Sequence, residues 1–380
     1  MTAAVAIAAC VVAMAIPDTL FQRGGTPPGQ PTEIRFPVIS DERAGDYPCS
    51  VAIGLLDQDS IPDLAVANYG SNSVSVLLGN GDGTFRARRE FPAAFLPYTV
   101  AIGDLNQDGH ADLAVASEGS GQVTELLNDG EGGFHQRIDL DVGGGAYSVA
   151  LGDLNGDGHL DLVASNLNQN QVTVLLGNGD GSFRPGVAYA TAHGPRSATI
   201  VDLDLDGSPD LAVACFNSNA VSILLGNGDG TFRRRKDHAT GPSPYSVQWG
   251  WIDADPWPDL AVSCLVSNSV SVLLGAGNGE LRRRRDVRTA ARPYGLAVVD
   301  LNGDGRADLA TADLATGTVT IAAGKGDGEF LRGIQMSTGR NPQCIAVGDL
   351  NRDGAPDLVT ANTASNTVRI FLNRGRGARP

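Results

Sequence analysis

The sequence predicts an all-β protein built as a seven-bladed β-propeller, with four antiparallel strands in each blade. Three observations lead to this prediction. A loop rich in Asp, Asn and Gly occurs seven times at a fixed spacing of 49 residues, and fixed periods of this length are typical of repeat architectures. Each loop is accompanied by stretches with the periodicity of β-strands, and no helical periodicity of useful length appears. The last repeat is short by one strand, and the N-terminal part of the chain contains a segment in register to supply it.

The third repeat shows the four predicted strands of a blade. The stretch SVALGDL, residues 148–154, alternates between apolar and polar positions, and DLVASN, residues 161–166, is a short apolar run. QVTVLLGN, residues 171–178, alternates again, and FRPGVAYAT, residues 183–191, follows a turn of Gly, Asn and Asp. Such a turn is a strong hairpin signal, because these residues tolerate positive φ angles. Four strands repeated seven times fit a propeller; a β-helix and an array of β-sandwiches are the alternatives.

The sequence divides into a leader and a body. We interpret residues 1–30 as a signal-like apolar segment and linker, since the apolar run over residues 2–16 is short for a membrane span and typical of a secretory signal. A misassigned start and a buried strand are the alternatives, and residues 7–10 also resemble a lipoprotein acylation box. Residues 31–380 form the propeller, in which the period counted back from Phe85 reaches Phe36. A strand near Phe36 is therefore expected to complete the last blade and close the ring, which removes an open end.

The charge balance narrows the class of partner. A formal charge of −15 argues against a nucleic-acid partner, because phosphate backbones attract basic surfaces, and it is compatible with cation binding. After the leader, no segment is apolar enough for a transmembrane anchor. We therefore expect an exported monomer that is extracellular, at the cell surface or in the periplasm.

The repeated loop has the ligand pattern of a calcium site. The seven loops begin at positions 55, 104, 153, 202, 251, 300 and 349. Numbered from its first residue, the loop has side-chain oxygens at positions one, three, five and nine, a Gly at six that permits a sharp turn, and a backbone carbonyl at seven. An all-oxygen set suits a hard cation of the size of calcium.

Five loops keep the complete set, so we expect about five Ca²⁺ ions. With the residue that offers its carbonyl at position seven included, the predicted ligands are Asp104, Asn106, Asp108, His110 and Asp112; Asp153, Asn155, Asp157, His159 and Asp161; Asp202, Asp204, Asp206, Ser208 and Asp210; Asp300, Asn302, Asp304, Arg306 and Asp308; and Asp349, Asn351, Asp353, Ala355 and Asp357. Asp, Asn and Gly also favour turns without any metal. The identical spacing in five loops favours a cation, because carboxylates this close together repel one another.

The first and fifth loops depart from this pattern. They have Leu55 and Trp251 at position one and Ser60 and Pro256 at position six, but they keep carboxylates at three, five and nine. We expect these two loops to bind metal weakly or not at all. In the fifth loop, packing of Trp257 is expected to replace the ion.

The motif GDLNGDGHLDL, residues 152–162, with strands on both sides and a later Gly-rich turn, resembles the FG-GAP and VCBS-type repeats, which include the calcium-bearing blades of the integrin α-chain propeller. The resemblance covers residues 36–379. It implies a seven-bladed propeller with calcium between the first two strands of certain blades, at the five ligand sets named above. The literal Phe-Gly and Gly-Ala-Pro signatures are missing, which favours a bacterial-type variant over an integrin. The family contains adhesion modules, lectins and some polysaccharide-degrading enzymes.

A second candidate site lies on the opposite face of the predicted ring. Antiparallel blades place the acidic loops and Gly-rich turns on one face, the loop face, and the remaining turns and the links between blades on the other, the link face. On the link face, six positions before each acidic loop, stand Cys49, Tyr98, Tyr147, Arg196, Tyr245, Tyr294 and Gln343. The four Tyr and Arg196 are candidate ligand-binding residues, because such side chains stack and form hydrogen bonds; the alternative is that each Tyr packs as core between blades. Asn68, Asn166, Asp313 and Asn362 form a second column on this face, as ligands or as turn formers.

Two further features of the sequence, the basic runs and the cysteines, each allow more than one interpretation. The basic runs at residues 233–236 and 282–285 either grip an acidic polysaccharide or only deter aggregation at outer strands. Cys49 and Cys344 stand at nearly equivalent places in the first and last blades, so a disulfide clasp between them is a hypothesis. Cys215 and Cys264 share one column and are expected to be small buried residues.

Enzyme chemistry finds less support in the sequence. None of the five His residues pairs with a shared base or nucleophile, and no phosphate loop or zinc spacing appears. We therefore expect an exported, calcium-binding, non-catalytic interaction or adhesion module with a protein or polysaccharide ligand. The alternative is a lectin-like protein or a polysaccharide lyase that uses Tyr98 or Tyr147 with Arg196.

Overall fold

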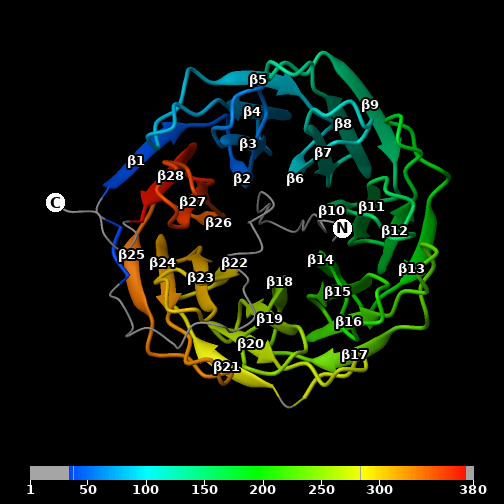
Figure 1. Ribbon diagram of the computed structural model, residues 1–380, viewed down its shortest axis with the longest axis vertical. Helices are drawn as coiled ribbons and strands as arrows, with labels where there is room; N and C mark the ends of the chain where they lie inside the picture. The colour runs from blue at the N-terminus through cyan, green and yellow to red at the C-terminus, as the bar shows by residue number, and fades with distance from the viewer. Residues whose placement is uncertain (1–33, 37, 283, 374–380) are drawn as a thin grey trace.

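Seven four-stranded antiparallel sheets surround a common axis in chain order, and each sheet is one blade of a ring (Figure 1). The computed structural model describes residues 34–36, 38–282 and 284–373, and these residues form 28 β-strands and no helix. The predicted seven-bladed propeller with four antiparallel strands per blade is therefore confirmed. The predicted leader, residues 1–30, lies outside the described residues. Within the described ranges, no helix is long and apolar enough to cross a membrane.

The strands of a blade run from the axis outwards in a fixed order. The innermost strands are β2 (Pro48–Gly54), β6 (Pro97–Gly103), β10 (Ala146–Gly152), β14 (Pro195–Val201), β18 (Pro244–Gly250), β22 (Pro293–Val299) and β26 (Pro342–Gly348). The second strands are β3 (Asp63–Asn68), β7 (Asp112–Ser117), β11 (Asp161–Asn166), β15 (Asp210–Cys215), β19 (Asp259–Cys264), β23 (Asp308–Asp313) and β27 (Asp357–Asn362). The third strands are β4 (Ser73–Leu77), β8 (Gln122–Leu127), β12 (Gln171–Leu175), β16 (Ala220–Leu224), β20 (Ser269–Leu273), β24 (Thr318–Ala322) and β28 (Thr367–Leu372). The outer strands are β5 (Arg89–Pro92), β9 (Gln136–Asp141), β13 (Val187–Ala190), β17 (Lys236–Ala239), β21 (Arg285–Arg288), β25 (Ile334–Ser337) and, in the seventh blade, β1 (Val38–Arg43).

The seventh blade contains strands from both ends of the described chain. β1 pairs antiparallel with β28, and the two lie side by side in Figure 1, blue against red. Arg369 in β28 donates hydrogen bonds to both carboxylate oxygens of Asp41 in β1, at 2.7 and 2.6 Å. Phe36 packs edge-on against Phe371, with ring centroids 6.1 Å apart. The outer strand of this blade therefore comes from residues 38–43.

The second strand of each blade forms the centre of the core. All six residues of each of these seven strands are buried, because each strand has a neighbour on either side and another blade over each face. Both faces must then be apolar, which explains why DLVASN shows an apolar run rather than an alternation. The outer strands, such as β13 and β17, are mostly exposed.

A repeated Asn connects the turn after the second strand to the link that leaves the blade. Asn72, Asn170, Asn219, Asn268 and Asn366 have positive φ angles of 52–55°, a conformation that Asn tolerates better than most residues. The side-chain oxygen of each accepts a backbone N–H bond from the link, at 2.8–3.0 Å. This bond shapes the link face in the same way in five blades.

One buried carboxyl group interrupts the repeat. Glu125 in β8 stands where the third strands of the other blades have Val or Ile, such as Val174 in β12. It is fully buried, and neither carboxylate oxygen has a hydrogen-bond partner. Burial raises the pKa of Glu125 from 4.5 to about 8, and the nearby Asp112 adds to this shift.

We expect Glu125→Val to stabilise the protein and to reduce the pH dependence of its stability. The folded state holds the Glu125 proton more tightly than the unfolded state, so the free energy of unfolding falls as pH rises from 4.5 towards about 8. Between pH 4.5 and neutrality this loss amounts to about 3 kcal/mol. Denaturant unfolding at about pH 5 and about pH 8 measures it. Glu125→Gln is the matched control, since it removes the titration and keeps the size; an unchanged pH dependence in both variants would contradict the explanation.

Candidate metal loops and axial cluster

Each acidic loop is fixed to its blade by the Asp at position nine. This Asp begins the second strand, and its two carboxylate oxygens accept bonds from two different turns in all seven blades. Oδ2 accepts the backbone N–H of loop position two at 2.7–2.9 Å, and Oδ1 accepts an N–H just after the third strand at 2.7–2.8 Å. In the first six blades this N–H belongs to the Gly-rich turn, and in the seventh it belongs to Asn373. The residues are Asp63, Asp112, Asp161, Asp210, Asp259, Asp308 and Asp357. The carboxylate therefore joins the acidic loop to the Gly-rich turn whether or not position one has an Asp.

In five blades a Gly donates the bond to Oδ1, and Gly177 shows why. The N–H of Gly177 lies 2.8 Å from Asp161 Oδ1. A Cβ on Gly177 would lie 2.2 Å from the carbonyl oxygen of Leu160, which is closer than side-chain atoms can approach. The Gly of the sequence LLGN is thus required by the close approach of two turns.

Backbone N–H groups orient the other loop carboxylates and amides. In all seven loops the N–H of position five donates to the side-chain oxygen of position three at 2.8–3.4 Å. The N–H of position seven donates to Oδ1 of position five at 2.8–3.0 Å. In the five complete loops the N–H of position six donates to Oδ2 of position one at 2.7–3.0 Å. The structure thus places the predicted side-chain ligands of each complete loop together, around one tight turn.

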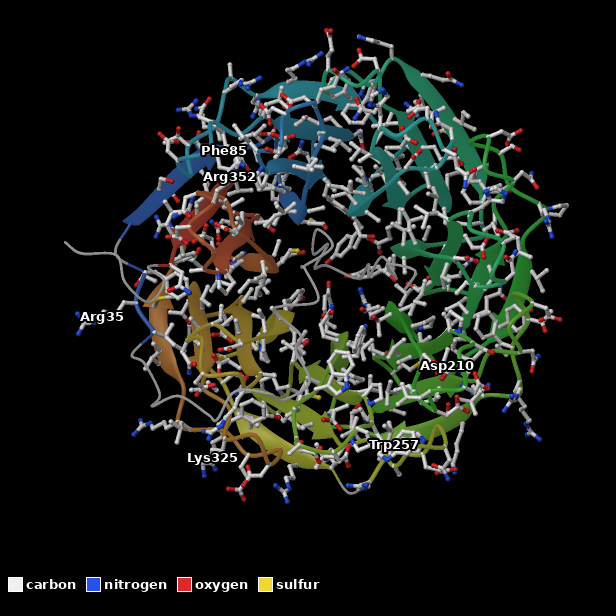
Figure 2. All side chains as sticks on the ribbon, in the orientation of Figure 1. Arg35, Phe85, Asp210, Trp257, Lys325 and Arg352 are labelled. Carbon is white, nitrogen blue, oxygen red and sulfur yellow. The ribbon has the colours of Figure 1, made fainter. Side chains whose placement is uncertain are left out.

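Two of the loops gather carboxylates that could hold a metal ion. Among the described residues, two loops bring carboxylate oxygens from three residues to within 4.8 Å of one another, namely Asp202, Asp204 and Asp210 of the fourth blade and Asp253, Asp255 and Asp259 of the fifth. This separation suits ligands on one ion, because calcium lies 2.3–2.6 Å from its oxygens. In the second blade Asp104 Oδ1 is buried and has no hydrogen-bond partner, as expected of an oxygen that faces a cation. Asp210 and Trp257 mark these two neighbouring blades in Figure 2.

Burial raises the pKa of every Asp at position nine. The value is about 6 for Asp63, Asp112, Asp161 and Asp259 and about 7 for Asp210, Asp308 and Asp357. The two N–H donors lower the pKa, and the other carboxylates of the loop raise it. These groups are therefore partly protonated near neutral pH unless a cation lies beside them.

The first and fifth loops contain an arginine beside the carboxylates. Arg86 reaches Asp57 at 3.2 Å and Asp59 at 3.0 Å, so that one guanidinium bridges positions three and five. Arg282 lies 2.8 Å from Asp255, at position five of the fifth loop. The carboxylate cluster of the fifth loop is thus already neutralised in part by a guanidinium.

The equivalent arginines stand further away where position one is Asp. Arg184 lies 3.8 Å from Asp157 in the third blade, and Arg233 lies 3.7 Å from Asp206 in the fourth. The arginine therefore closes on the carboxylates only in the two loops that lack the first ligand. Sequence reasoning missed these residues, although their recurrence at one position of four repeats is the signal that would find them.

Two indole rings pack at the fifth loop. The ring of Trp251 lies 5.1 Å from that of Trp249, edge to face. Trp257 covers Gly277 in the Gly-rich turn so closely that a Cβ there would lie 2.1 Å from its ring. Aromatic packing therefore accompanies the Arg282 ion pair at this loop.

On the link face, the structure brings the five candidate residues together around the ring axis. We call Tyr98, Tyr147, Arg196, Tyr245, Tyr294 and Gln343 the axial cluster. The Tyr245 hydroxyl shares hydrogen bonds with the hydroxyls of Tyr98 and Tyr147, and Tyr98 donates to Gln343 at 2.8 Å. Arg196 stacks over Tyr147 at 4.3 Å. Tyr98, Tyr147 and Tyr245 are buried, whereas Arg196, Tyr294 and Gln343 are partly exposed.

The buried tyrosines of the axial cluster have raised pKa values. Burial raises the pKa values of Tyr98, Tyr147 and Tyr245, and for Tyr147 the positive charge of Arg196 only partly opposes this. A phenol that is to remove a proton near neutral pH needs a lowered pKa. The lyase alternative that uses Tyr98 or Tyr147 with Arg196 therefore gains no support from these groups.

The second link-face column and the cysteines are buried. Asn68 accepts the N–H of Gly45 at 3.0 Å and donates to two Ser hydroxyls. Asn166, Asp313 and Asn362 are likewise buried and hydrogen-bonded, as expected of turn formers.

Cys215 and Cys264 are buried thiols. Cys49 and Cys344 are buried free thiols in this structure, so the hypothesis of a disulfide clasp gains no support. Cys344 Sγ instead accepts the backbone N–H of Val51, at 3.5 Å.

Most of the described members of the two basic runs face carboxylates, and the exposed Arg234 is the exception. In the first run, Arg235 pairs with Asp237 at 3.1 Å and Lys236 pairs with Glu280. In the second, Arg284 pairs with Asp286 at 3.1 Å. A hollow of about 550 Å³ lies beside the second run, and Asp253 and Asp327 line it together with the arginines. These cations are thus spread over ion pairs on the rim rather than gathered in an unpaired basic patch.

The fold and the loops define a class, a β-propeller built from acidic-loop repeats. The model of the FG-GAP-like repeat matches six overlapping segments of the chain, residues 56–115, 104–164, 153–213, 202–262, 252–311 and 300–360. These segments span most of the chain. The protein belongs to the FG-GAP-like repeat family, and the family resemblance of the sequence is confirmed.

Comparison with solved structures shows the fold alone. The BBS1N chain from a complex with ARL6DN is 12% identical, with a TM-score of 0.64, and the match covers 91% of this chain and 98% of that chain. A lectin from Agrocybe aegerita is 19% identical, with a TM-score of 0.55 and coverage of 77% and 81%. The periplasmic gluconolactonase of Pseudomonas aeruginosa is 18% identical, with a TM-score of 0.57 and coverage of 74% and 84%. A search of curated proteins found no match.

We expect Arg86→Met to make the first blade depend on calcium. The change leaves Asp57 and Asp59 without their cation, so the unfolding free energy in chelator should fall by about 1 kcal/mol, the upper range for a partly exposed ion pair. Added calcium should recover part of this loss by neutralising the same carboxylates. Thermal unfolding in chelator and in calcium measures both effects. Arg184→Met is the control, because its 3.8 Å pair lies in a complete loop; an equal loss in the control would contradict the special role of Arg86.

Calcium binding should weaken as the pH falls from about 8 to about 5.5, because protons compete for the position-nine carboxylates. The pKa values of about 6 to about 7 place this loss in that window. Without metal, the free energy of unfolding depends on pH in the opposite direction. A raised folded-state pKa stabilises the protein at low pH, and this stability is lost as the pH rises through about 6 to 7. Isothermal titration with calcium at both pH values is the measurement. Equal affinity at the two pH values would contradict this assignment.

Proposed function

We propose that this protein is an exported, calcium-binding β-propeller that acts as a non-catalytic interaction module. The observation that carries the proposal is the repetition of one complete set of oxygen ligands in five blades, oriented in each by the same backbone hydrogen bonds. Calcium on the loop face neutralises buried carboxylates and stiffens the ring. The link face is then free to bind a protein or polysaccharide ligand.

Several observations support the role of an interaction module. The ring offers two broad faces made of turns, and the similar structures show that such rings serve in binding: BBS1N is in complex with ARL6DN, and the lectin from Agrocybe aegerita recognises non-reducing terminal N-acetylglucosamine. The raised pKa values of the axial tyrosines favour binding over catalysis. Export agrees with the signal-like segment and with a calcium supply outside the cell.

A fold hosts many functions, so the second candidate is a lectin-like protein, favoured by the aromatic axial cluster.

The test of calcium binding is unfolding with calcium and with chelator, combined with metal counting. We expect close to five ions per chain. Each site should add about 2.7 kcal/mol to the unfolding free energy at a calcium concentration a hundred times its dissociation constant. No bound metal and no shift of the unfolding temperature would overturn the proposal.

A matched pair of variants ties the ions to the loops. Asp157→Asn removes one ligand charge and keeps the oxygen that accepts the N–H of His159, so the metal count should fall by one. Asp180→Asn is the control, because Asp180 lies in the exposed Gly-rich turn of the same blade, where it caps Ser182. A lower metal count in the control alone, or in neither variant, would place the ions elsewhere.

A further inference from the structure

The charge of the link face differs from that of the whole protein. The chain carries a formal charge of −15. Three arginines, Arg196, Arg292 and Arg340, stand in the link-face turns at 69–72, in the links at 44–47, in the repeats of both, and in the axial cluster. The carboxylates on this face are Asp46, Glu118 and the buried Asp313. The acidic loops lie on the opposite face. An anion therefore meets less repulsion on the link face than on the loop face.

Arg196 is the central cation of this face, and no described carboxylate lies within ion-pairing distance of it. Its guanidinium lies 4.3 Å from the ring of Tyr147, 5.0 Å from Phe216 and 5.6 Å from Tyr245. Its Nε atom is buried without a hydrogen-bond partner. Other arginines of the protein, such as Arg86 and Arg369, face carboxylates at 2.6–3.2 Å. A half-buried cation with aromatic neighbours and no counter-ion is costly to desolvate, and an anionic ligand would remove that cost.

The shape of the site limits how a ligand can bind. The cavity inside the axial cluster measures about 10 Å³, which is room for about one water molecule. A ligand cannot enter between the tyrosines, so it must lie across the cluster and reach Arg196 from outside. The apolar side chains Tyr69, Leu167, Phe216 and Leu265 pack around the cluster. A ligand would meet one cation, several hydroxyl groups and a rim of flat apolar surface.

We propose that the axial cluster binds an oxyanion of an acidic saccharide chain, with the guanidinium of Arg196 as its anchor. This inference rests on the proposed role as an interaction module and names its ligand class. A guanidinium binds carboxylate and sulfate groups in the same two-pronged manner, so the shared chemistry is an oxyanion. A peptide is the less suitable ligand, because peptides dock on open sheet edges or in apolar grooves. Each blade has two edge strands: the outer strands lie on the rim of the ring (Figure 1), and the inner strands, such as β14 with Arg196, line the axis. At the axis the cavity of about 10 Å³ leaves no room for a peptide strand to pair with β14.

The test is calorimetric titration of the full chain, at constant calcium, with three probes. Oligogalacturonate carries carboxylates, a sulfated galactan oligosaccharide carries sulfates, and a neutral galactan oligosaccharide carries neither. We expect one or both anionic probes to bind and the neutral probe not to bind. The carboxylate and sulfate arms then identify the oxyanion. Binding of the neutral probe with equal affinity, or binding of no probe, would overturn the inference.

Variants locate the binding at Arg196. Arg196→Gln should weaken anionic binding at least tenfold, and Arg196→Lys, which keeps the charge, should recover part of it. Arg292→Gln changes an exposed arginine near Tyr294 and should weaken binding less, without disturbing the core. Arg369→Gln is the control on the rim and should have no effect. Unchanged affinity in Arg196→Gln would overturn the inference, as would selective binding of a C-terminal peptide carboxylate in place of the saccharides.

The two proposals fail in different ways. Each variant is checked for its unfolding temperature and its bound calcium before titration, so that a misfolded protein is recognised. An unaltered calcium response with no saccharide binding would overturn the ligand class and leave the calcium-binding propeller. Saccharide binding without any bound metal would overturn the calcium proposal and leave the Arg196 site.

Discussion

The loop face of this protein depends on one buried carboxylate in each blade, the Asp at position nine. Its two oxygens accept N–H bonds from two different turns, so it fixes the acidic loop against the Gly-rich turn. These bonds occur in all seven blades, including those with Leu55 and Trp251 at position one. The shape of the loop therefore comes from the backbone, and a cation only has to neutralise carboxylates that are already in place.

The seven blades differ in the positive charge that can lie beside their loop carboxylates. Five loops offer a full set of oxygens to a metal ion, whereas Arg86 and Arg282 bring a guanidinium to the carboxylates of the other two. A guanidinium is always available and is charged at every physiological pH, but it occupies a fixed place on the chain. A metal ion must come from the solution and can leave. Under the proposed calcium binding, the ring would combine two blades that carry their own cation with five blades that take one from the solution.

The fold could be predicted from the sequence because every repeat applies the same local constraints: the fully apolar second strand, the Gly of LLGN and the evenly spaced loop. The five predicted ligand sets rest on the same periodicity and remain a prediction. Features that break the repeat or depend on distant contacts could not be predicted. The common column of Tyr98 and Tyr245 was predicted, but the hydrogen bond between their hydroxyls across the axis was not. Glu125 replaces an aliphatic residue at a single position. For the contact of Arg86 with a loop 27 residues earlier, the recurrence of the arginine in four repeats was the signal in the sequence. The sequence could not decide whether Cys49 and Cys344 are bonded, and the structure has both as free thiols.

The pairing of β1 with β28 has a consequence for the synthesis of the chain. Asp41 and Arg369, which face each other in this ladder, are 328 residues apart. At ordinary rates of translation, β28 leaves the ribosome on the order of half a minute after β1. Throughout that interval β1 has no strand beside it, and an unpaired strand is a template for association with other chains. The period of greatest exposure to aggregation is thus set by the speed of the ribosome and not by the folding rate of any single blade.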